Sequence, residues 1–424
     1  MLNKKFTKYY KKIILSKIKQ KGFTYVLGKI IKRLINFKIL VIYPIVFILC
    51  LIIKIIKPVF FIRFGNLRSV KIGPSVMITE MSLCEQENDI QPNKEKTFNI
   101  YYKGNDPHVC NKQLLKMWER ILRVHPITQY FYNIMNLFSF GKDHTIEPKK
   151  FGRDIHGLLE KTPVHLTFTK KEIIQAKKEL LNIGIGEKDK YVLIINRGNR
   201  YMAKTFPNLD NTYNDFRNCN INDFVPMSEK LTRKGYTVLR VGHMTSDLIE
   251  TNNQKIIDYD RRGFRTDLLD IYLGANCRYI VGTDTGYMHV PGYLFRKPTV
   301  HVNFSQFEHL LPWLSSWLFI FKKYWLKDQK RFMHVGEILK SGAGRFNFYK
   351  DYKKNGIELI NNTPEEITEV VDEMEKRIIG TWEDSEEDNE LQKRFWSHFK
   401  SSDYSGIVKG KIGRQFLKDN RDLF

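Results

Sequence analysis

Acidic residues are missing from the first 79 positions of this 424-residue chain, and Glu80 is the first Asp or Glu. The same stretch holds seventeen of the 70 lysines and arginines, which leaves a net charge of only +7 out of +24 for the other 345 residues. Nucleic-acid binding would predict a basic stripe interleaved with aromatic residues, and the body of the chain lacks one. The excess charge therefore belongs to an N-terminal arm, and nucleic acid is not an expected partner.

Cysteine is also scarce, and the chain has no C-x-x-C pair and no histidine cluster at metal-binding spacing. The five cysteines are scattered: Cys50, Cys84, Cys110, Cys219 and Cys277. This usage predicts a reduced compartment and excludes a structural zinc site. No internal repeat or low-complexity block is present, and the length favours two domains with appendages.

The N-terminal arm combines basic and apolar residues. Residues 1–37 alternate lysines with Ile, Leu, Phe and Tyr, which is typical of basic amphipathic helices at a membrane interface. The uncharged run 39–53 follows, and it is shorter than the roughly 20 residues of a spanning helix. We therefore expect an in-plane or re-entrant anchor attracted to anionic lipid headgroups. A true span and a buried helix of the soluble core are the alternatives.

From residue 63 onward, short apolar runs alternate with stretches of helical periodicity. In the first half, strands are predicted at 70–81, 98–102 and 164–167, and helices at 111–124 and 170–182. In the second half, strands at 191–195, 236–241, 256–259, 278–281 and 299–303 alternate with helices at 222–234, 265–276 and 286–295. This alternation predicts parallel sheets in a two-domain α/β architecture with a cleft between the domains.

The last predicted helix has the clearest ends. Thr363 is a candidate N-cap, Pro364 suits the first helical position, and Glu366 completes a capping box. Gly380 is the expected stop. The acidic run 383–390 beyond it is interpreted as a solvated connection.

The most informative segment is the strand, turn and helix pattern at 278–298. Its turn residues are small or polar: Gly282, Thr283, Asp284, Thr285 and Gly286. Glycines let the backbone approach a ligand, and the free N–H groups at a helix start bind anions. His289, one turn into the helix, adds a hydrogen-bond donor. A phosphate or pyrophosphate site at the carboxyl end of the strand is therefore predicted, with an ordinary ligand-free turn as the alternative.

The pattern Asp284-Thr285-Gly286-x-x-His289, with Pro298 before the next strand, resembles the donor-site segment of the bacterial ADP-heptose heptosyltransferases. A longer ordered series resembles a family of glycosyltransferases from bacterial surface-polysaccharide gene clusters. It covers about residues 63–396 and consists of 70–73 with Glu80, 111–120, 215–218 with Ile221, 235–242, 267–273, 282–298 with Asn303, and 362–380.

This resemblance implies a GT-B fold, in which two Rossmann-like domains face each other across a cleft. The implied division is a membrane-associating arm at 1–62, an acceptor domain at 63–188, a nucleotide-sugar domain at 189–380 and a tail at 381–424. The implied activity is transfer of a sugar from a nucleotide-sugar donor to a surface-polysaccharide or lipid-linked glycan, such as lipopolysaccharide or capsule. It needs neither a metal nor a cofactor, and its expected place is the cytoplasmic face of the bacterial inner membrane.

Metal-independent sugar transfer requires cations that stabilise the leaving phosphate and a base that accepts the acceptor's proton. Besides the turn residues and His289, the candidate cations are Arg197, Arg217 and Arg240. Glu80 is the leading candidate for the base, expected at the end of a strand, with Asp106 and His108 as rivals.

Two other functions are also compatible with the sequence. A sugar-nucleotide epimerase could use the same fold and phosphate turn, but it would have no need of a membrane arm. A non-enzymatic membrane-associated binding protein would explain the arm without using the turn.

Overall fold

The structure is a computed structural model, and it describes residues 37–92, 97–104, 108–148, 150–198, 200–205, 212–245, 247–399 and 406–424. The chain divides into two compact units that interleave in sequence. Unit 1 takes the described residues of Met1–Val70, Glu85–Val109 and Trp118–Pro148. Unit 2 takes those of Lys71–Cys84, Cys110–Met117 and Lys149–Phe424. The domain boundaries implied by the sequence resemblance stay predictions.

Unit 1 is built on a small parallel sheet with strand order β3-β2-β1-β4. Its strands are β1 (Ile62–Asn66), β2 (Phe98–Tyr102), β3 (Arg123–Val124) and β4 (Thr145–Ile146). Two helices belong wholly to this unit, α3 (Phe37–Ile56) and α6 (Thr128–Met135), and they pack on one another. The predicted strand 98–102 is confirmed by β2.

Helix α3 buries one face in the core of unit 1. Val46, Cys50 and Ile53 recur at helical spacing, and they pack with Phe64 of β1 and Ile134 of α6. This periodicity makes the inner face of the apolar run 39–53 part of a folded core. Between these residues Phe47 also packs against the core, whereas Ile48, Leu49, Leu51 and Ile52 are exposed.

Unit 2 contains a seven-stranded sheet with order β14-β10-β9-β8-β5-β6-β7, and all of its pairings are parallel. The strands are β5 (Tyr191–Ile195), β6 (Thr237–Arg240), β7 (Ile256–Asp258), β8 (Ile280–Gly282), β9 (Thr299–Phe304), β10 (Trp317–Phe321) and β14 (Lys411–Ile412). Every residue of β5, β9 and β10 is buried, as expected of parallel strands covered on both faces.

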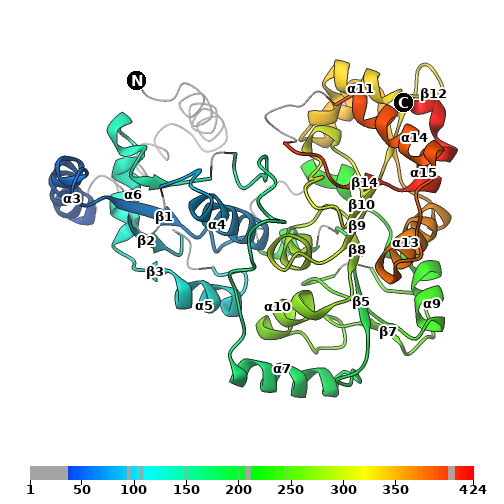
Figure 1. The fold of residues 1–424 in the computed structure, drawn as a ribbon, viewed down its shortest axis with the longest axis horizontal. Coiled ribbons are helices and arrows are strands. Elements are labelled where there is room, and N and C mark those ends of the chain that lie inside the picture. The colour runs from blue at the N-terminus through cyan, green and yellow to red at the C-terminus, as the bar shows by residue number, and fades with distance from the viewer. Residues whose placement is uncertain are drawn as a thin grey trace. The chain divides into compact units, whose positions relative to one another are not determined.

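Helices cover both faces of this sheet (Figure 1). Helices α9 (Val225–Arg233) and α13 (Pro364–Ile379) lie on one face, and α10 (Asp267–Asn276) lies on the other. The remaining helices of unit 2 are α7 (Lys170–Asn182), α8 (Arg200–Thr205), α11 (Val335–Ser341), α12 (Tyr349–Lys354), α14 (Glu386–Ser397) and α15 (Arg414–Asp419). A small antiparallel sheet joins β11 (Lys323–Leu326), β12 (Arg331–Phe332) and β13 (Ile357–Ile360).

The winding of the large sheet reverses at its centre. From β5 the chain proceeds outward through β6 and β7, whereas from β8 it proceeds outward in the other direction through β9 and β10. Strands β5 and β8 are therefore neighbours whose following loops diverge, and a crevice forms between such loops in open α/β sheets. The predicted α/β class with parallel sheets is confirmed.

Several predicted elements agree closely with the structure. Helix α7 and strand β5 have the predicted bounds, and α10 begins two residues inside its predicted range. Helix α13 has the capping box between Thr363 and Glu366, and Gly380 ends it in the left-handed conformation at φ 76°. The predicted helix 111–124 is the shorter α5 (Lys112–Ile121).

Three predicted elements are wrong. Residues 70–81 are not a strand but the start of helix α4 (Ile72–Glu87), in which Pro74 occupies the first turn, where its missing N–H costs nothing. Most of this helix is buried, so the sequence shows no helical stripe. Residues 164–167 form no strand. The acidic run 383–390 is not a loop, because Ser385 caps helix α14.

The predicted helix 286–295 is also not regular. It consists of a 3-10 turn at Gly286–His289 followed by a π-helical turn at Val290–Leu294. Both glycines of this segment touch neighbouring groups closely, and a Cβ on Gly292 would lie 2.6 Å from Oγ1 of Thr299. The irregular backbone is thus part of the packing beside the β8 turn.

Candidate functional site

A cavity of about 570 Å³ lies in unit 2 at the carboxyl ends of β5, β6 and β8. Its lining includes residues 195–198 after β5, 241–245 after β6 and 284–287 after β8, and the start of α4 adds 71–74. This is the crevice expected where the strand order reverses. Its size suits a small organic ligand, for which sites of roughly 300–1,000 Å³ are usual.

The glycines of the β8 turn are required by close packing. A Cβ on Gly282 would lie 2.5 Å from the carbonyl oxygen of Ile195, and one on Gly286 would lie 3.1 Å from the backbone nitrogen of Gly73. Gly286 therefore lets the β8 turn and the first turn of α4 meet at the cavity. The start of α4 was missed as part of the site because its sequence was read as a strand.

The two threonines of the turn have different surroundings. Thr283 is 1% exposed, and its Oγ1 accepts the backbone N–H of Arg197 at 2.9 Å, which ties the β8 turn to the β5 loop. Thr285 lines the cavity, and no partner among the described residues hydrogen-bonds its Oγ1. Gly282 and Thr283 thus shape the turn, whereas Thr285 presents its hydroxyl beside the cavity.

Asp284 and Arg217 form the central ion pair of the cavity. Nη2 of Arg217 donates to Oδ2 of Asp284 at 2.5 Å and to its backbone carbonyl at 2.7 Å. Burial by itself would raise the pKa of Asp284, but the neighbouring positive groups, Arg217 foremost, together outweigh it, and the pKa lies below its ordinary value. The carboxylate is therefore ionised at neutral pH and fixes the orientation of the guanidinium.

Arg197 adds a second guanidinium to the same cavity. Burial and the neighbouring charge of Arg217 lower the pKa of Arg197 to about 10, so it remains charged at neutral pH. The Nε atoms of Arg197 and Arg217 are buried, and neither has a hydrogen-bond partner in the part of the chain that the structure describes. Buried donors without partners indicate a ligand that supplies acceptors, and two adjacent arginines favour an anionic one.

His289 lines the cavity and is 8% exposed. Burial lowers its pKa to about 4, so the imidazole is neutral at pH 7 and can donate or accept a hydrogen bond without carrying charge. His301 of β9 lies beneath the site, stacked on Phe319 at 4.7 Å between ring centroids. Burial lowers the pKa of His301 to about 3.

Arg240 also lines the cavity, but both of its Nη nitrogens donate to the protein, and only its Nε has no partner among the described residues. It is 1% exposed, and it donates to Asp258 at 3.0 Å, to the side chain of Asn196 at 2.9 Å and to the carbonyl of Asp247. These contacts connect the ends of β5, β6 and β7. The structure therefore gives Arg240 a positioning role for the loops around the cavity.

The candidate base Glu80 lies inside helix α4 and not at the end of a strand, which corrects its predicted position. Its side chain is fully buried, and Oε1 lies 2.6 Å from Nη2 of Arg296 and 3.0 Å from Nδ1 of His165. Glu80 is not part of the cavity lining. These contacts favour a structural ion pair, and its role as a base stays a prediction.

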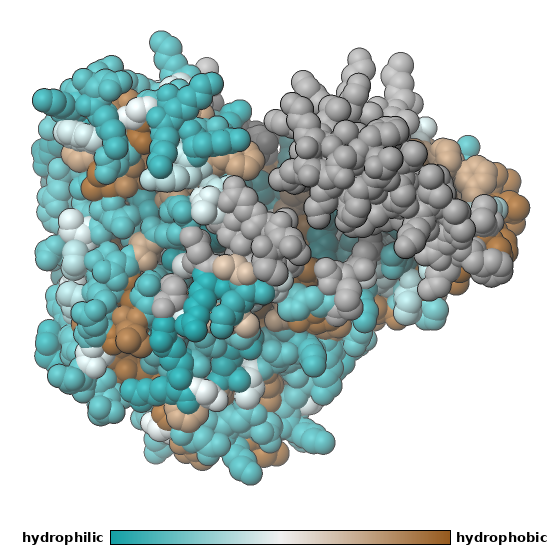
Figure 2. All heavy atoms as spheres, turned by 180° about the vertical axis from the view of Figure 1, so that it is seen from behind, coloured by the Kyte–Doolittle hydropathy of each residue, from teal (hydrophilic) through white to brown (hydrophobic). Residues whose placement is uncertain are grey.

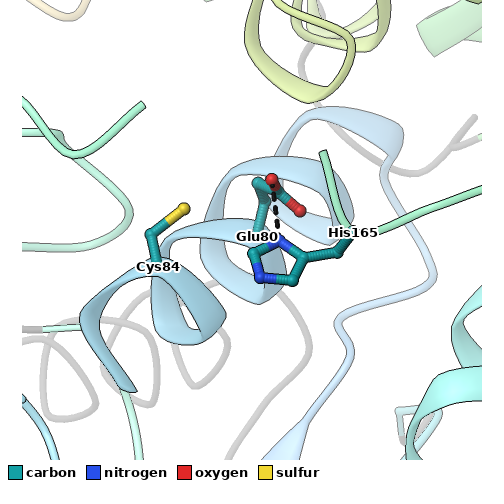
Figure 3. A group of neighbouring side chains, drawn as sticks. All are labelled: Glu80, Cys84 and His165. Atoms are coloured by element: carbon teal, nitrogen blue, oxygen red, sulfur yellow. Dashed lines mark ion pairs between the residues drawn. The ribbon is translucent and has the colours of Figure 1, made fainter. Parts of the chain in front are cut away.

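Glu80 also belongs to a cluster with Cys84 and His165 (Figure 3), whose potential ligand atoms lie within 4.8 Å of one another. Arg296 already places a positive charge at this cluster, because its Nη2 donates to Oε1 of Glu80 and lies 3.7 Å from Sγ of Cys84. A metal ion would face the repulsion of that guanidinium. The cluster therefore does not fit a metal site.

Asp106 and His108 are the other two candidates for the base. Asp106 lies outside the described residues. His108 is exposed and belongs to unit 1, whereas all residues that line the cavity belong to unit 2. The structure thus brings together Arg197, Arg217, Asp284, Thr285, Gly286 and His289, with Arg240 behind them.

No family model and no curated protein matches the chain. Among solved structures, a glycosyl transferase family 9 protein from Veillonella parvula DSM 2008 is 12% identical at a TM-score of 0.37, with 57% of this chain and 80% of that chain covered. The E. coli ADP-heptose lps heptosyltransferase II is 12% identical at a TM-score of 0.35, with coverages of 61% and 90%. Both similarities are weak.

Proposed function

We propose that the protein is a glycosyltransferase of the GT-B class that binds a nucleotide-sugar in the cavity of unit 2. The observation that carries the proposal is the pair of guanidinium groups, Arg197 and Arg217, whose buried Nε donors have no partner in the described part of the chain. They adjoin the glycine turn of β8, at the position where open α/β sheets bind nucleotides. A pyrophosphate supplies the negative charge and the acceptor oxygens that this arrangement lacks.

The proposed reaction breaks the bond between the anomeric carbon of the donor sugar and the terminal phosphate oxygen. A new bond forms from that carbon to an acceptor hydroxyl oxygen, and the hydroxyl proton passes to a base. Negative charge accumulates on the leaving phosphate, so Arg197 and Arg217 stabilise the transition state more than the ground state. Thr285 and the N–H groups of the turn add hydrogen bonds to the same oxygens.

We propose that these arginines take the place of a divalent cation and that no cofactor takes part. Arg217 is held by Asp284 in one orientation, so little rearrangement is needed when charge develops. His289 is neutral, which suits a hydrogen bond to a sugar hydroxyl. The base stays open among Glu80, Asp106 and His108.

We further propose that the acceptor is a membrane-bound glycan and that α3 associates with the lipid surface. The outward side of α3 exposes an apolar row at helical spacing, Ile45 (54%), Ile48 (58%), Ile52 (48%), Ile55 (74%) and Val59 (92%) just beyond its end. This row lies opposite the buried Val46, Cys50 and Ile53. Figure 2 shows apolar residues on the surface of this edge of unit 1.

The apolar row continues onto neighbouring parts of unit 1. Leu137 is 58% and Phe138 39% exposed, and the Phe138 ring lies 5.3 Å from Phe47 of α3. Together with the basic charge of the first 79 residues, this surface favours anionic lipid headgroups as the partner. No helix in the described part of the chain is both long and apolar enough to cross a membrane. Residues 1–36 of the expected arm lie outside the described residues.

The cytoplasmic face of a bacterial inner membrane and a surface polysaccharide as product complete the proposal, and both rest on the sequence resemblance alone. Incubation of the full-length protein with UDP-, GDP-, ADP- and CMP-sugars, followed by an assay for free nucleotide, tests the function. Release of nucleotide from one donor by the wild type, and its loss in Arg217→Ala, is the expected result. Equal release by both proteins would contradict the assignment of the site.

A further inference from the structure

Phe151 is an aromatic side chain at the cavity, and it has no part in the proposed donor site. It lines the cavity, yet it is 77% exposed, which is more than any other large apolar side chain among the described residues of unit 2. Lone exposed apolar residues are common on protein surfaces. An aromatic ring at the opening of a polar cavity is different, because sites for organic ligands combine polar groups with such rings.

The backbone holds Phe151 in an unusual conformation. Its φ is +53°, a left-handed value that bulky residues rarely adopt, and the following Gly152 has a φ of +82°. Strain of this kind persists where the surroundings determine the conformation, and it is concentrated at ligand-binding sites. The position of the ring is therefore imposed by its neighbours.

Four contacts of the next two residues, Gly152 and Arg153, hold the backbone there. Gly152 packs directly on α4, since a Cβ there would lie 2.9 Å from the carbonyl of Met77, and the hydroxyl of Tyr293 donates to the Gly152 carbonyl. Arg153 donates to the carbonyl of Leu310 at 2.7 Å and lies over the ring of the buried Trp313 at 5.3 Å. The chain is thus held in place directly after Phe151.

We propose that Phe151 is a stacking platform for a sugar ring of the acceptor glycan, an inference that rests on the proposed function. One face of a sugar ring presents mainly C–H groups, and these pack favourably on the electron-rich face of an aromatic ring. The hydroxyl rim of the sugar stays free for polar groups of the cavity. An aromatic platform beside a polar cavity therefore recognises a saccharide by chemistry that a lipid tail or a metal ion does not share.

The acceptor sugar fits Phe151 better than the base of the donor nucleotide does. The anion-binding groups lie on the loops after β5 and β8, and the cavity extends from them along the end of β6 through residues 241–245. Phe151 instead directly precedes Gly152, which packs on α4, where Met77 and Ile78 contribute to the lining. The donor is thus assigned to the strand ends and the acceptor to the α4 side of the same cavity.

Saturation-transfer NMR on the full-length protein tests this inference with the methyl glycosides of glucose, galactose, mannose, rhamnose and N-acetylglucosamine. We expect saturation of the C–H protons of at least one glycoside by the wild type and by Phe151→Trp. Phe151→Ala should reduce that signal at least fivefold. Ile174→Ala is the control, because Ile174 of α7 is 70% exposed, close to the 77% of Phe151, but does not line the cavity.

Nucleotide binding, followed by calorimetry with UDP, GDP and ADP, separates this inference from the proposed function. Unchanged nucleotide affinity in Phe151→Ala together with the lost glycoside signal supports the platform. A glycoside signal that survives in Phe151→Ala, or that is absent from the wild type, overturns it. Loss of nucleotide affinity in Phe151→Ala overturns it as well, since the ring would then stack on the base. Failure of every nucleotide to bind the wild type contradicts the proposed function and leaves the glycoside result to decide on Phe151.

Discussion

Nη2 of Arg217 bridges two oxygens of one residue, Oδ2 of Asp284 at 2.5 Å and its backbone carbonyl at 2.7 Å. The contact joins the last residue of η2 (Thr212–Arg217) to the turn after β8. It uses one nitrogen of the guanidinium and leaves Nε without a partner among the described residues. The contact with Asp284 thus fixes the orientation of the Arg217 guanidinium and leaves part of it available for a further anion.

Replacement of Arg217 should weaken nucleotide binding strongly. A hydrogen bond to a charged group contributes roughly 1.5–3 kcal/mol, so Arg217→Ala should raise the Kd for the preferred nucleoside diphosphate about 10- to 100-fold. Arg217→Lys should bind the nucleotide only slightly more tightly than Arg217→Ala does, because an ammonium group lacks the planar fork of donors. Calorimetry measures the Kd, and a circular dichroism spectrum confirms the fold of each variant. A lysine variant with wild-type affinity would contradict the geometry.

The two threonines of the β8 turn provide a matched pair. Thr285→Val should weaken nucleotide binding without loss of stability, because its Oγ1 is buried without a partner in the described residues. Thr283→Val should instead lower the free energy of unfolding by about 1–3 kcal/mol, because it leaves the N–H of Arg197 without an acceptor. Urea unfolding and calorimetry on both variants check this. A loss of stability in Thr285→Val with unchanged nucleotide binding, or weaker binding in Thr283→Val with unchanged stability, would contradict these roles of the two hydroxyls.

Substitution of Glu80, the partner of Arg296, tests whether the role of Glu80 is structural or catalytic. Removal of one partner of a buried ion pair costs about 3–5 kcal/mol, so Glu80→Ala should be strongly destabilised, whereas Glu80→Gln, which keeps an acceptor for Arg296, should lose less stability. Unfolding free energies of the three proteins are the measurement. A stable Glu80→Ala protein with greatly reduced kcat would instead mark Glu80 as the base.

The buried histidines predict a loss of stability in acid. His301 has a folded pKa of about 3, whereas in the unfolded chain it takes up a proton near pH 6.5. The unfolded state therefore binds more protons as the pH falls below about 6.5, and at pH 5 this costs about 2 kcal/mol of stability. His301→Phe should remove that part of the difference between pH 8 and pH 5. Equal losses for the variant and the wild type would rule out a neutral buried imidazole.

The outward row of α3 should control binding to lipid vesicles. Ile48→Glu and Ile55→Glu place charges on the exposed side of α3 without touching its buried face, so both should reduce co-sedimentation with phosphatidylglycerol vesicles. Ile379→Glu, at a 60% exposed position of unit 2, is the control and should have no effect. Retention of both α3 variants on the vesicles would contradict the membrane-docking role.

The sequence allowed the parallel α/β architecture to be predicted because strands such as β5 are short apolar runs between amphipathic helices. It also located the β8 turn, since glycines and an anion-binding pattern are local features. It did not reveal the nature of α4, because a helix buried on most sides has no apolar stripe and its first residues alternate as a strand does. The first strand, β1, was hidden for a related reason, since it follows directly on the apolar residues of α3.

Side-chain roles were harder to predict than elements. Arg217 is favoured in sequence because it lies inside the 215–218 motif, but only contacts between distant segments show that Asp258 and Asn196 engage Arg240. Glu80 was singled out as the first acid of the chain, and its partner Arg296 lies 216 positions away. Phe151 carried no signal at all, since its position depends on a left-handed backbone held by Gly152 and its neighbours.

A thermal-shift series with UDP-, GDP-, ADP- and CMP-sugars, on the wild type beside Arg217→Ala, tests the central claim most directly. A ligand that binds only the folded state at about 100 times its Kd stabilises it by about 2.7 kcal/mol, which raises Tm by a few degrees. At least one nucleotide-sugar should raise the Tm of the wild type and leave that of Arg217→Ala unchanged. No shift with any donor, or equal shifts in both proteins, would contradict it.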